Sequence, residues 1–303
     1  MTTKVSIIIP CFNQAAYLHK AVTSLQSQTL TEWECIIVDD GSSDNIAEVV
    51  TNIALKDPRF RLIQQLNGGS GSARDAGMRA AKGKYIQFLD ADDTIASEKL
   101  ERQVTLMEQQ DLDISYTAFC SEDENGQHSK AKSIALNMRR LLTQWGLGAS
   151  TPIHAFMYRT DFIRQNKLLF QSDCRVREDW KWHIHCFLAK PKHAAIPDYC
   201  GAVYYQNKGG KTSSYIKIQE GNFAFLAYMT GQLYGCHKLC WTYRISEELW
   251  IWLLRMVKYR STAIGKTIAP LISHTGYLLA AILLMPISFI SIMCYFVKTY
   301  LVG

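Results

Sequence analysis

Residues 5–40 read VSIIIPCFNQAAYLHKAVTSLQSQTLTEWECIIVDD, and this stretch decides the fold. The β-branched run at 5–9 predicts a buried strand, the apolar residues of 15–25 recur at helical spacing, and ECIIVDD at 34–40 predicts a second buried strand. The same alternation continues to about residue 91. Strands that alternate with helices indicate βαβ units, so the sequence predicts an α/β fold with a mostly parallel sheet flanked by helices.

The composition sets the scale of the molecule. The chain has 303 residues, of which 48% are apolar, enough for a full α/β core and more than one average domain needs. We expect one large domain over residues 1–220 and a smaller helical region over residues 221–303. The nine cysteines form no close C-x-x-C pair and follow an N-terminus without a cleavable secretory pattern, so we expect reduced, cytosol-facing thiols.

The smaller region contains a long apolar run. Residues 267–297 contain no Asp, Glu, Lys or Arg, and this run exceeds the roughly 20 apolar residues that cross a bilayer. The aromatic and basic stretch LWIWLLRMVKYR precedes it, as suits a membrane interface. A buried soluble helix is the alternative, and Pro270, Gly276 and Pro286 also allow a re-entrant or kinked element. We expect one membrane-spanning segment.

The basic charge of the chain is concentrated beside this run. Residues 222–303 contain seven basic and two acidic residues, so +5 of the net charge of +6 lies there. The basic residues before the run outnumber Lys298 after it, which predicts a membrane-associated protein whose large domain is on the cytoplasmic side. Positive charge next to an apolar run favours a membrane-surface or lipid-linked partner over nucleic acid.

Three carboxylates follow a predicted buried strand in YIQFLDADDT, at Asp90, Asp92 and Asp93. Carboxylates this close repel one another and are costly unless hydration or a cation offsets the repulsion. They could cap a helix that starts near Ser97, but one acid would suffice for that purpose. Mg²⁺ and Mn²⁺ prefer oxygen ligands and bind substrate phosphates as well, so a metal with a diphosphate ligand is the favoured interpretation.

Other polar stretches lie at the ends of predicted strands, where α/β sheets bind ligands. VDDGSSD is either a simple strand exit or a site in which Asp40 accepts hydrogen bonds from a uracil imide or ribose. Phe12, in PCFNQ, flanks a base or packs in the core. NGGSGSARDAG is a poor dinucleotide fingerprint, because it follows the third strand. It is a plain turn, or it brings backbone and Arg74 close to a phosphate.

A second acid pair, Glu178 and Asp179, opens a predicted helix in REDWKWHIHC. Acids at a helix N-terminus need no further function, yet a carboxylate facing the crevice can take the proton of an attacking hydroxyl. Trp180 could stack on a sugar or belong to the core. The nearby histidines and cysteine do not predict zinc, because positions two apart on a helix face different directions. NKGGKTSS, at 207–214, is a surface loop or a lid.

The ordered set VSIIIPCFNQAAYL, IIVDDGSSD, NGGSGSARDAGMRAAKGKYIQFLDADD and REDW resembles the family 2 glycosyltransferases of GT-A fold over about residues 4–215. The resemblance implies a nucleotide-sugar donor, most often a UDP-sugar, and inversion at the anomeric carbon. It also implies Mn²⁺ or Mg²⁺ at a D-x-D motif, here Asp90-Ala91-Asp92, with Asp92 and Asp93 as candidate ligands.

The resemblance also implies site roles. Asp179 would be the catalytic base, with Glu178 and Trp180 near the acceptor. The candidate donor-binding residues are Pro10, Phe12, Asn13, Asp40, Asn67, Arg74, Asp90, Ala91, Asp92, Lys208 and Lys211.

Two departures from the family pattern refine this expectation. No Q-x-x-R-W motif is present, which favours the transfer of a single sugar over polymerisation. The NKGGKTSS loop lacks the histidine that some relatives have there, which leaves the roles of its lysines open. The sequence therefore predicts a metal-dependent inverting glycosyltransferase acting on a glycan or lipid-linked acceptor in cell-surface polysaccharide or glycoconjugate synthesis. The alternatives are a membrane-tethered sugar-nucleotide-binding protein without turnover and a Rossmann-type NAD(P) oxidoreductase.

Overall fold

The computed structural model describes residues 3–122, 129, 136–143, 151–170 and 177–205, with residues 229, 231–233, 237 and 244–245. The chain divides into two compact units, one of residues 1–136 and 150–208 and one of residues 137–149 and 209–303. The apolar run at 267–297 lies outside the described residues, as do Lys208 and Lys211. No helix within the described part of the chain is long and apolar enough to cross a membrane.

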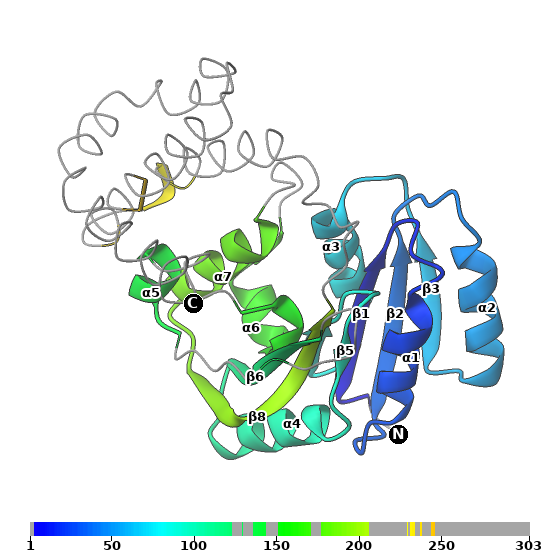
Figure 1. The fold of residues 1–303 in the computed structure, drawn as a ribbon. Helices are drawn as coiled ribbons and strands as arrows, with labels where there is room; N and C mark the ends of the chain where they lie inside the picture. The colour runs from blue at the N-terminus through cyan, green and yellow to red at the C-terminus, as the bar shows by residue number, and fades with distance from the viewer. Residues whose placement is uncertain are drawn as a thin grey trace, which may run out of the picture. The chain divides into compact units, whose positions relative to one another are not determined.

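The first unit is built on an eight-stranded sheet with the order β3-β2-β1-β4-β7-β6-β8-β5 (Figure 1). Its first half is parallel and contains β1 (Val5–Cys11), β2 (Trp33–Asp39), β3 (Phe60–Gln64) and β4 (Tyr85–Phe88). These strands are connected through α1 (Leu18–Gln26), α2 (Ile46–Lys56) and α3 (Ser70–Ala80). The strand–helix–strand pattern expected from residues 5–40 is confirmed.

The second half of the sheet is mixed. It contains β5 (Thr94–Ile95), β6 (Ile114–Glu122), β7 (Phe156–Arg159) and β8 (His193–Tyr205), and β7 runs antiparallel to both β4 and β6. Strand β8 pairs in parallel with β6 and antiparallel with the short β5. The helical elements are α4 (Lys99–Gln109), η1 (Ile153–Ala155), α6 (Thr160–Gln165) and α7 (Glu178–Leu188), while α5 (Met138–Thr143) lies in the second unit.

Strands β1 and β2 are buried almost throughout, which explains why their residues are mostly apolar. Alternate residues of β1, such as Ile7 and Ile9, pack in one core with residues of α1, α2 and α4. Ile8 points to the opposite face, where α3 packs so tightly that a Cβ added at Gly77 would overlap it. An aromatic group extends this second face, in which Phe88 of β4 meets Trp182 of α7 edge-on at 5.7 Å.

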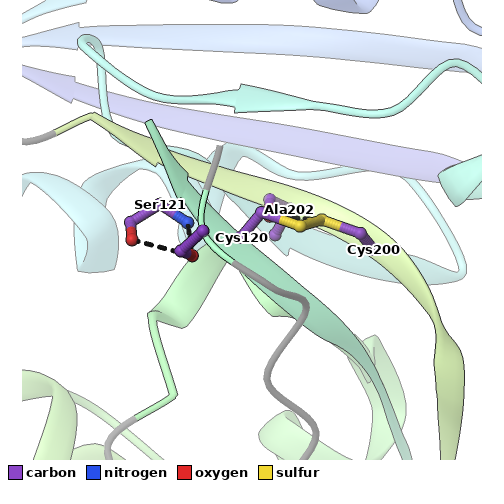
Figure 2. The surroundings of a disulfide bond; sticks show 5 residues. Cys120, Ser121, Cys200 and Ala202 are labelled. Carbon is purple, nitrogen blue, oxygen red and sulfur yellow. Dashed lines mark hydrogen bonds between the residues drawn. A yellow bond between two sulfur atoms is a disulfide. The ribbon is translucent and has the colours of Figure 1, made fainter. Parts of the chain in front are cut away.

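One cysteine pair differs from the expectation of reduced thiols. Cys120 of β6 and Cys200 of β8 are joined by a disulfide (Figure 2). Their Cα atoms are 6.1 Å apart, within the range that a disulfide bridges, because β6 and β8 are neighbouring strands. Among the described residues, Cys11, Cys35 and Cys186 are free and buried. Burial raises the pKa of the Cys35 and Cys186 thiols, which keeps these two sulfurs protonated.

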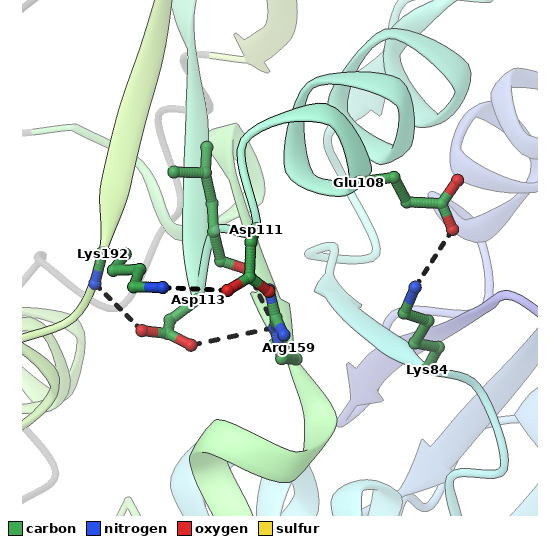
Figure 3. Close-up of polar contacts among 7 residues, drawn as sticks. Lys84, Glu108, Asp111, Asp113, Arg159 and Lys192 are labelled. Atoms are coloured by element: carbon green, nitrogen blue, oxygen red, sulfur yellow. Dashed lines mark hydrogen bonds and ion pairs between the residues drawn. The ribbon is translucent and has the colours of Figure 1, made fainter.

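A charged cluster joins three turns at one end of the second half of the sheet (Figure 3). Asp111 lies 2.7 Å from Arg159 Nη2 and 2.8 Å from Lys192 Nζ, and Asp113 accepts a hydrogen bond from the backbone N–H of Lys192 at 2.9 Å. The cluster lies where β6 and β8 begin and β7 ends, at the opposite end of the sheet from the carboxyl ends of β1, β2 and β4. It therefore contributes to stability and not to the candidate site.

Candidate active site

The acidic loop follows β4 directly, at the carboxyl edge of the parallel strands. Asp90 and Asp92 are partly exposed, whereas Asp93 is buried with 1% of its surface accessible. The loop turns through a hydrogen bond from the N–H of Asp93 to the carbonyl of Asp90, at 3.1 Å. Helix α4 begins only at Lys99, so the acids do not form the N-cap of that helix. The capping alternative is wrong, and the interpretation as a ligand site remains.

Arg74 connects the two acidic groups. Its Nη2 lies 2.7 Å from Asp90 Oδ1, its Nη1 lies 3.2 Å from Asp179 Oδ1, and Glu178 is 3.9 Å away. The guanidinium is buried, with a side chain only 4% exposed, and it approaches the ring of Phe170 at 5.2 Å. Burial lowers the pKa of Arg74, but the three carboxylates outweigh this effect and leave the pKa above its ordinary value. Arg74 is therefore a permanent cation that holds both acids.

The start of α7 supplies the second acidic group. Glu178 and Asp179 are the first residues of the helix, after Arg177 in the left-handed region at φ 58°. Ser70 Oγ donates to Glu178 Oε1, which attaches the start of α7 to the start of α3. Trp180 is fully buried and the Arg177 guanidinium lies 5.0 Å from its ring, so its faces are not open for stacking on an acceptor. The core alternative for Trp180 therefore fits the structure better than the expected contact with an acceptor.

Asp40 lies where β2 ends, and its carboxylate is occupied by the chain itself. Oδ1 accepts hydrogen bonds from Gln65 Nε2 at 2.7 Å and from the N–H of Gly68 at 2.8 Å, and Oδ2 accepts from the N–H of Gly69 at 2.8 Å. Asn67 Nδ2 donates to the Asp40 carbonyl at 2.9 Å. Asp40 therefore shapes the loop that leads into α3, and a nucleoside at this edge would compete with these donors or use the remaining lone pair.

The loop after β1 lies against the loop after β2. Asn13 has φ 54° and its Oδ1 accepts from the N–H of Ser43 at 2.8 Å, so its amide oxygen holds the two loops together. Pro10 is buried within β1 and Ala91 is buried in the acidic loop, so both can present only backbone atoms to a ligand. Phe12 is 47% exposed, which fits the expectation that it flanks a base better than the core alternative.

His154 of η1 is a site residue for which no motif gave a signal. Its Nδ1 lies 3.1 Å from Asp93 Oδ2, and both side chains are buried. Burial lowers the pKa of His154 to about 4, so the imidazole is neutral at physiological pH. Burial and the charges of Asp90 and Asp92 raise the pKa of Asp93. The histidine lies 61 residues beyond Asp93 in the chain, and only the fold brings the two together.

The oxygen donors at this edge fit a hard divalent cation. Ligand atoms of Asp90, Asp93 and His154 lie within 4.8 Å of one another. Asp90 and Asp92 are the members that reach the surface, and Mg²⁺ or Mn²⁺ commonly binds one or two protein carboxylates together with water and phosphates. A cation between Asp90 and Asp92 is therefore compatible with a diphosphate ligand, whereas Asp93 and His154 are too deeply buried to share one with it.

Comparison with known proteins identifies the family to which the chain belongs. The family model described as Glycosyl transferase family 2 matches residues 6–174, more than half of the 303 residues. An uncharacterized glycosyltransferase of Bacillus subtilis, EpsJ, is 32% identical over 197 residues, which cover 62% of this chain and 57% of the relative. The uncharacterized glycosyltransferase RC0461 of Rickettsia conorii is 39% identical over 177 residues, 58% of this chain and 29% of that protein. The chain thus spans less than two thirds of either relative.

Solved structures show the same fold. S. aureus TarS 1-349 in complex with UDP-GlcNAc has a TM-score of 0.63 at 20% identity, covering 92% of this chain and 79% of that one. The mannosyltransferase PcManGT from Pyrobaculum calidifontis, in complex with GDP-Man and Mn²⁺, has a TM-score of 0.60 at 14% identity. The match covers 94% of this chain and 87% of that one. The α/β sheet is that of the GT-A glycosyltransferases. The matched range includes the acidic loop and Arg74 and ends just before α7. Because the family model matches more than half of the chain, the chain belongs to glycosyl transferase family 2.

Proposed function

We propose that the protein transfers a single sugar from a nucleotide-diphosphate sugar to a hydroxyl of a glycan or lipid-linked acceptor, with inversion and with Mn²⁺ or Mg²⁺. The observation that carries this proposal is the position of Arg74 between Asp90 and Asp179, at 2.7 and 3.2 Å. One guanidinium sets the spacing between an acid suited to the donor diphosphate and an acid suited to the acceptor. The lack of a Q-x-x-R-W motif supports single-sugar addition.

In the proposed reaction Asp179 accepts the proton of the acceptor hydroxyl while that oxygen attacks the anomeric carbon. The bond from the anomeric carbon to the diphosphate oxygen breaks as the new bond forms on the opposite face, so the configuration inverts. Asp90 and Asp92 would hold the cation, and when bound it neutralises the charge that develops on the departing diphosphate. Arg74 holds Asp90 and Asp179 in place, and its positive charge offsets theirs before Asp179 takes up the proton.

The test of the base assignment is Asp179→Asn. With Mn²⁺ and a panel of nucleotide sugars that includes UDP-GlcNAc and GDP-mannose, we expect donor binding to stay within about threefold of the wild type. Turnover should fall by about 10²- to 10⁴-fold, the range that a general base contributes. Asp161→Asn, at an exposed acid in the first turn of α6, is the matched control and should retain activity. Substantial turnover by Asp179→Asn would remove the base from this residue.

The test of the cation assignment is Asp92→Asn. We expect this variant to lose the part of the nucleotide affinity that depends on Mn²⁺ and to keep the part that does not. Equal affinity in the two proteins, with and without Mn²⁺, would exclude a cation at this loop. A wild-type protein that binds the donor and never turns over with any acceptor would instead support the membrane-tethered binding protein. Membership of a glycosyltransferase family argues against the NAD(P) oxidoreductase alternative.

We also propose that the protein works at a membrane, with the first unit on its cytoplasmic side. The support comes from the uncharged run at 267–297 and from the excess of basic residues that precedes it. The full chain should float with vesicles of anionic lipid and remain with them in high salt, because an apolar segment is not released by screening charge. Release of the chain in high salt would leave only an electrostatic contact with lipid headgroups.

A further inference from the structure

The carboxylate of Asp93 is directed into the protein and makes two contacts there. Oδ1 accepts a hydrogen bond from the backbone N–H of Tyr205 at 2.9 Å. Oδ2 lies 3.1 Å from Nδ1 of His154. Asp93 is 1% exposed and His154 is fully buried, so neither side chain presents an atom to a molecule at the surface. This aspartate therefore contacts two separate elements, η1 and the end of β8.

The backbone of His154 is fixed by a buried network of polar side chains. Its backbone carbonyl accepts a hydrogen bond from Gln87 Nε2 at 2.9 Å, within β4. Gln87 Oε1 in turn accepts from Lys99 Nζ, which also donates to Gln103 of α4. All these side chains are fully buried, where a polar group without a partner is expensive. The network fixes where η1 lies relative to β4 and α4, and so fixes the imidazole.

A cation bound between Asp93 and His154 would not serve the donor. Mg²⁺ and Mn²⁺ keep several water or phosphate oxygens in their coordination sphere, and those oxygens need room beside the protein ligands. With both side chains buried, that room is not present beside this pair. The separation of 3.1 Å brings the neutral imidazole into direct contact with the carboxylate, although neither ring nitrogen of His154 has the geometry of a hydrogen bond.

We propose that His154 is a positioning residue that acts through Asp93 to fix the acidic loop and to attach it to the end of β8. This inference rests on the proposed role of the acidic loop in binding the cation and the donor. Tyr205 is the last described residue of β8, and Lys208 and Lys211 follow it closely in the sequence. The pair thus holds Asp92, one residue before Asp93, at a fixed position relative to the end of β8.

The decisive measurement needs no nucleotide and no metal. Hydrogen exchange of the Tyr205 amide in the full chain reports the bond to Asp93 directly. We expect Asp93→Asn and His154→Ala to speed this exchange by about tenfold, the factor for the loss of roughly one hydrogen bond to a charged group. His154→Gln, which keeps a polar side chain beside the carboxylate and fills most of the space of the imidazole, should restore part of the protection. His183→Gln, at a second fully buried histidine, controls for general loss of stability.

A second measurement separates positioning from coordination. Binding of Mn²⁺ alone, followed by electron paramagnetic resonance of the free ion, should be weakened about threefold or less by His154→Gln and far more by Asp92→Asn. Mn²⁺-dependent binding of UDP or GDP, whichever the wild type binds, should weaken by about tenfold in His154→Ala and recover in part in His154→Gln, because positioning depends on a polar side chain that fills the space beside Asp93.

Two results would overturn the inference. Exchange of the Tyr205 amide that is no faster in His154→Ala than in His183→Gln would show that His154 does not act through Asp93. A loss of Mn²⁺ binding in His154→Gln as complete as that in Asp92→Asn would make the histidine a metal ligand. If the wild type bound no nucleotide, the proposed function would fail while the exchange result still decided whether the contact positions the loop.

Discussion

Replacing Arg74 by methionine removes the cation that the two acidic groups share. Methionine has a similar length and packs well in irregular space, so the packing against Phe170 is largely kept and the charge is lost. The variant leaves Asp90, Glu178 and Asp179 near one another without the guanidinium that contacts all three. We expect it to fold, to be less stable than the wild type, and to have a different dependence of stability on pH.

The magnitude follows from the contacts. Two unit charges at the 3.2 Å of the Arg74–Asp179 pair attract by roughly 5 kcal/mol at an effective dielectric constant of about 20. The side chains of Asp90 and Asp179 are 34% and 33% exposed, so water screens much of the charge that the variant leaves behind. Breaking a fully buried pair costs about 3–5 kcal/mol. We therefore expect a loss of about 2–3 kcal/mol at neutral pH.

The sign of the pH dependence is fixed by linkage. Without the guanidinium the folded variant binds protons more readily at these carboxylates than the folded wild type does. Its stability deficit is therefore largest at neutral pH and shrinks as the pH falls into the acidic range in which carboxylates take up protons, because protonation relieves the repulsion. Unfolding by urea at several pH values, followed by fluorescence, measures the deficit without any substrate.

The matched control is Arg164→Met. Arg164 donates to the backbone carbonyl of Ala81 at 3.1 Å, so its loss removes a hydrogen bond of arginine without exposing carboxylates to one another. We expect Arg164→Met to lose the same amount of unfolding free energy at neutral and at acidic pH. A deficit of Arg74→Met that stayed constant, or that grew as the pH fell, would refute the conclusion that this arginine holds the acids by charge.

Two further predictions concern the frame of the site. Hydrogen bonds from Lys192 and Arg159 lower the pKa of Asp111 to about 2, so its contribution is present above its ordinary value near 3.8 and is lost as the pH falls through about 2. Asp111→Asn should lower the midpoint of thermal unfolding slightly at pH 7, and the effect should vanish in about 1 M salt, because the cluster is exposed. An undiminished effect in salt would contradict the ionic account. Gly83→Ala should cost about 1–3 kcal/mol in urea unfolding, since a Cβ there would lie 2.6 Å from the backbone nitrogen of Ser6. Unchanged stability would mean that this turn can move.

The sequence predicts correctly which residues lie at the carboxyl edge of the sheet, because the ends of the strands follow from the local pattern of apolar and polar residues. Buried runs ending in Asp39-Asp40 and in Asp90 to Asp93 place both groups at strand ends, and parallel strands bring those ends to the same side. Nothing local indicates which of these acids faces solvent. Burial depends on the mixed half of the sheet, where β8 returns beside β5 and buries Asp93.

The features that the sequence did not predict also depend on contacts between segments far apart in the chain. Cys120 and Cys200 are 80 residues apart in the chain and become neighbours only through the β6–β8 pairing. Trp180 follows the acids of α7 directly, and the sequence does not show that the helix turns its ring inward. It is fully buried in the structure. His154 lies in a short apolar segment without a motif, and its role depends on the register of η1 against Asp93. Each depends on long-range packing that a single sequence does not encode locally.

Burial divides the aspartates of this edge into two kinds. Asp39 and Asp40 are 4% and 3% exposed and accept hydrogen bonds from the loop after β2, from β3 and from the loop after β3. Burial tends to raise the pKa of Asp39, but hydrogen bonds from Ser42 and Gln64 outweigh it and lower that pKa, so the charge persists inside the protein. The carboxylates that remain partly exposed, in the acidic loop and at the start of α7, are the ones that can exchange a proton or a ligand with solvent. In the proposed reaction the chemistry at this edge therefore belongs to the exposed acids, and the buried acids serve to shape the loops around them, as Asp40 does for the loop that leads into α3.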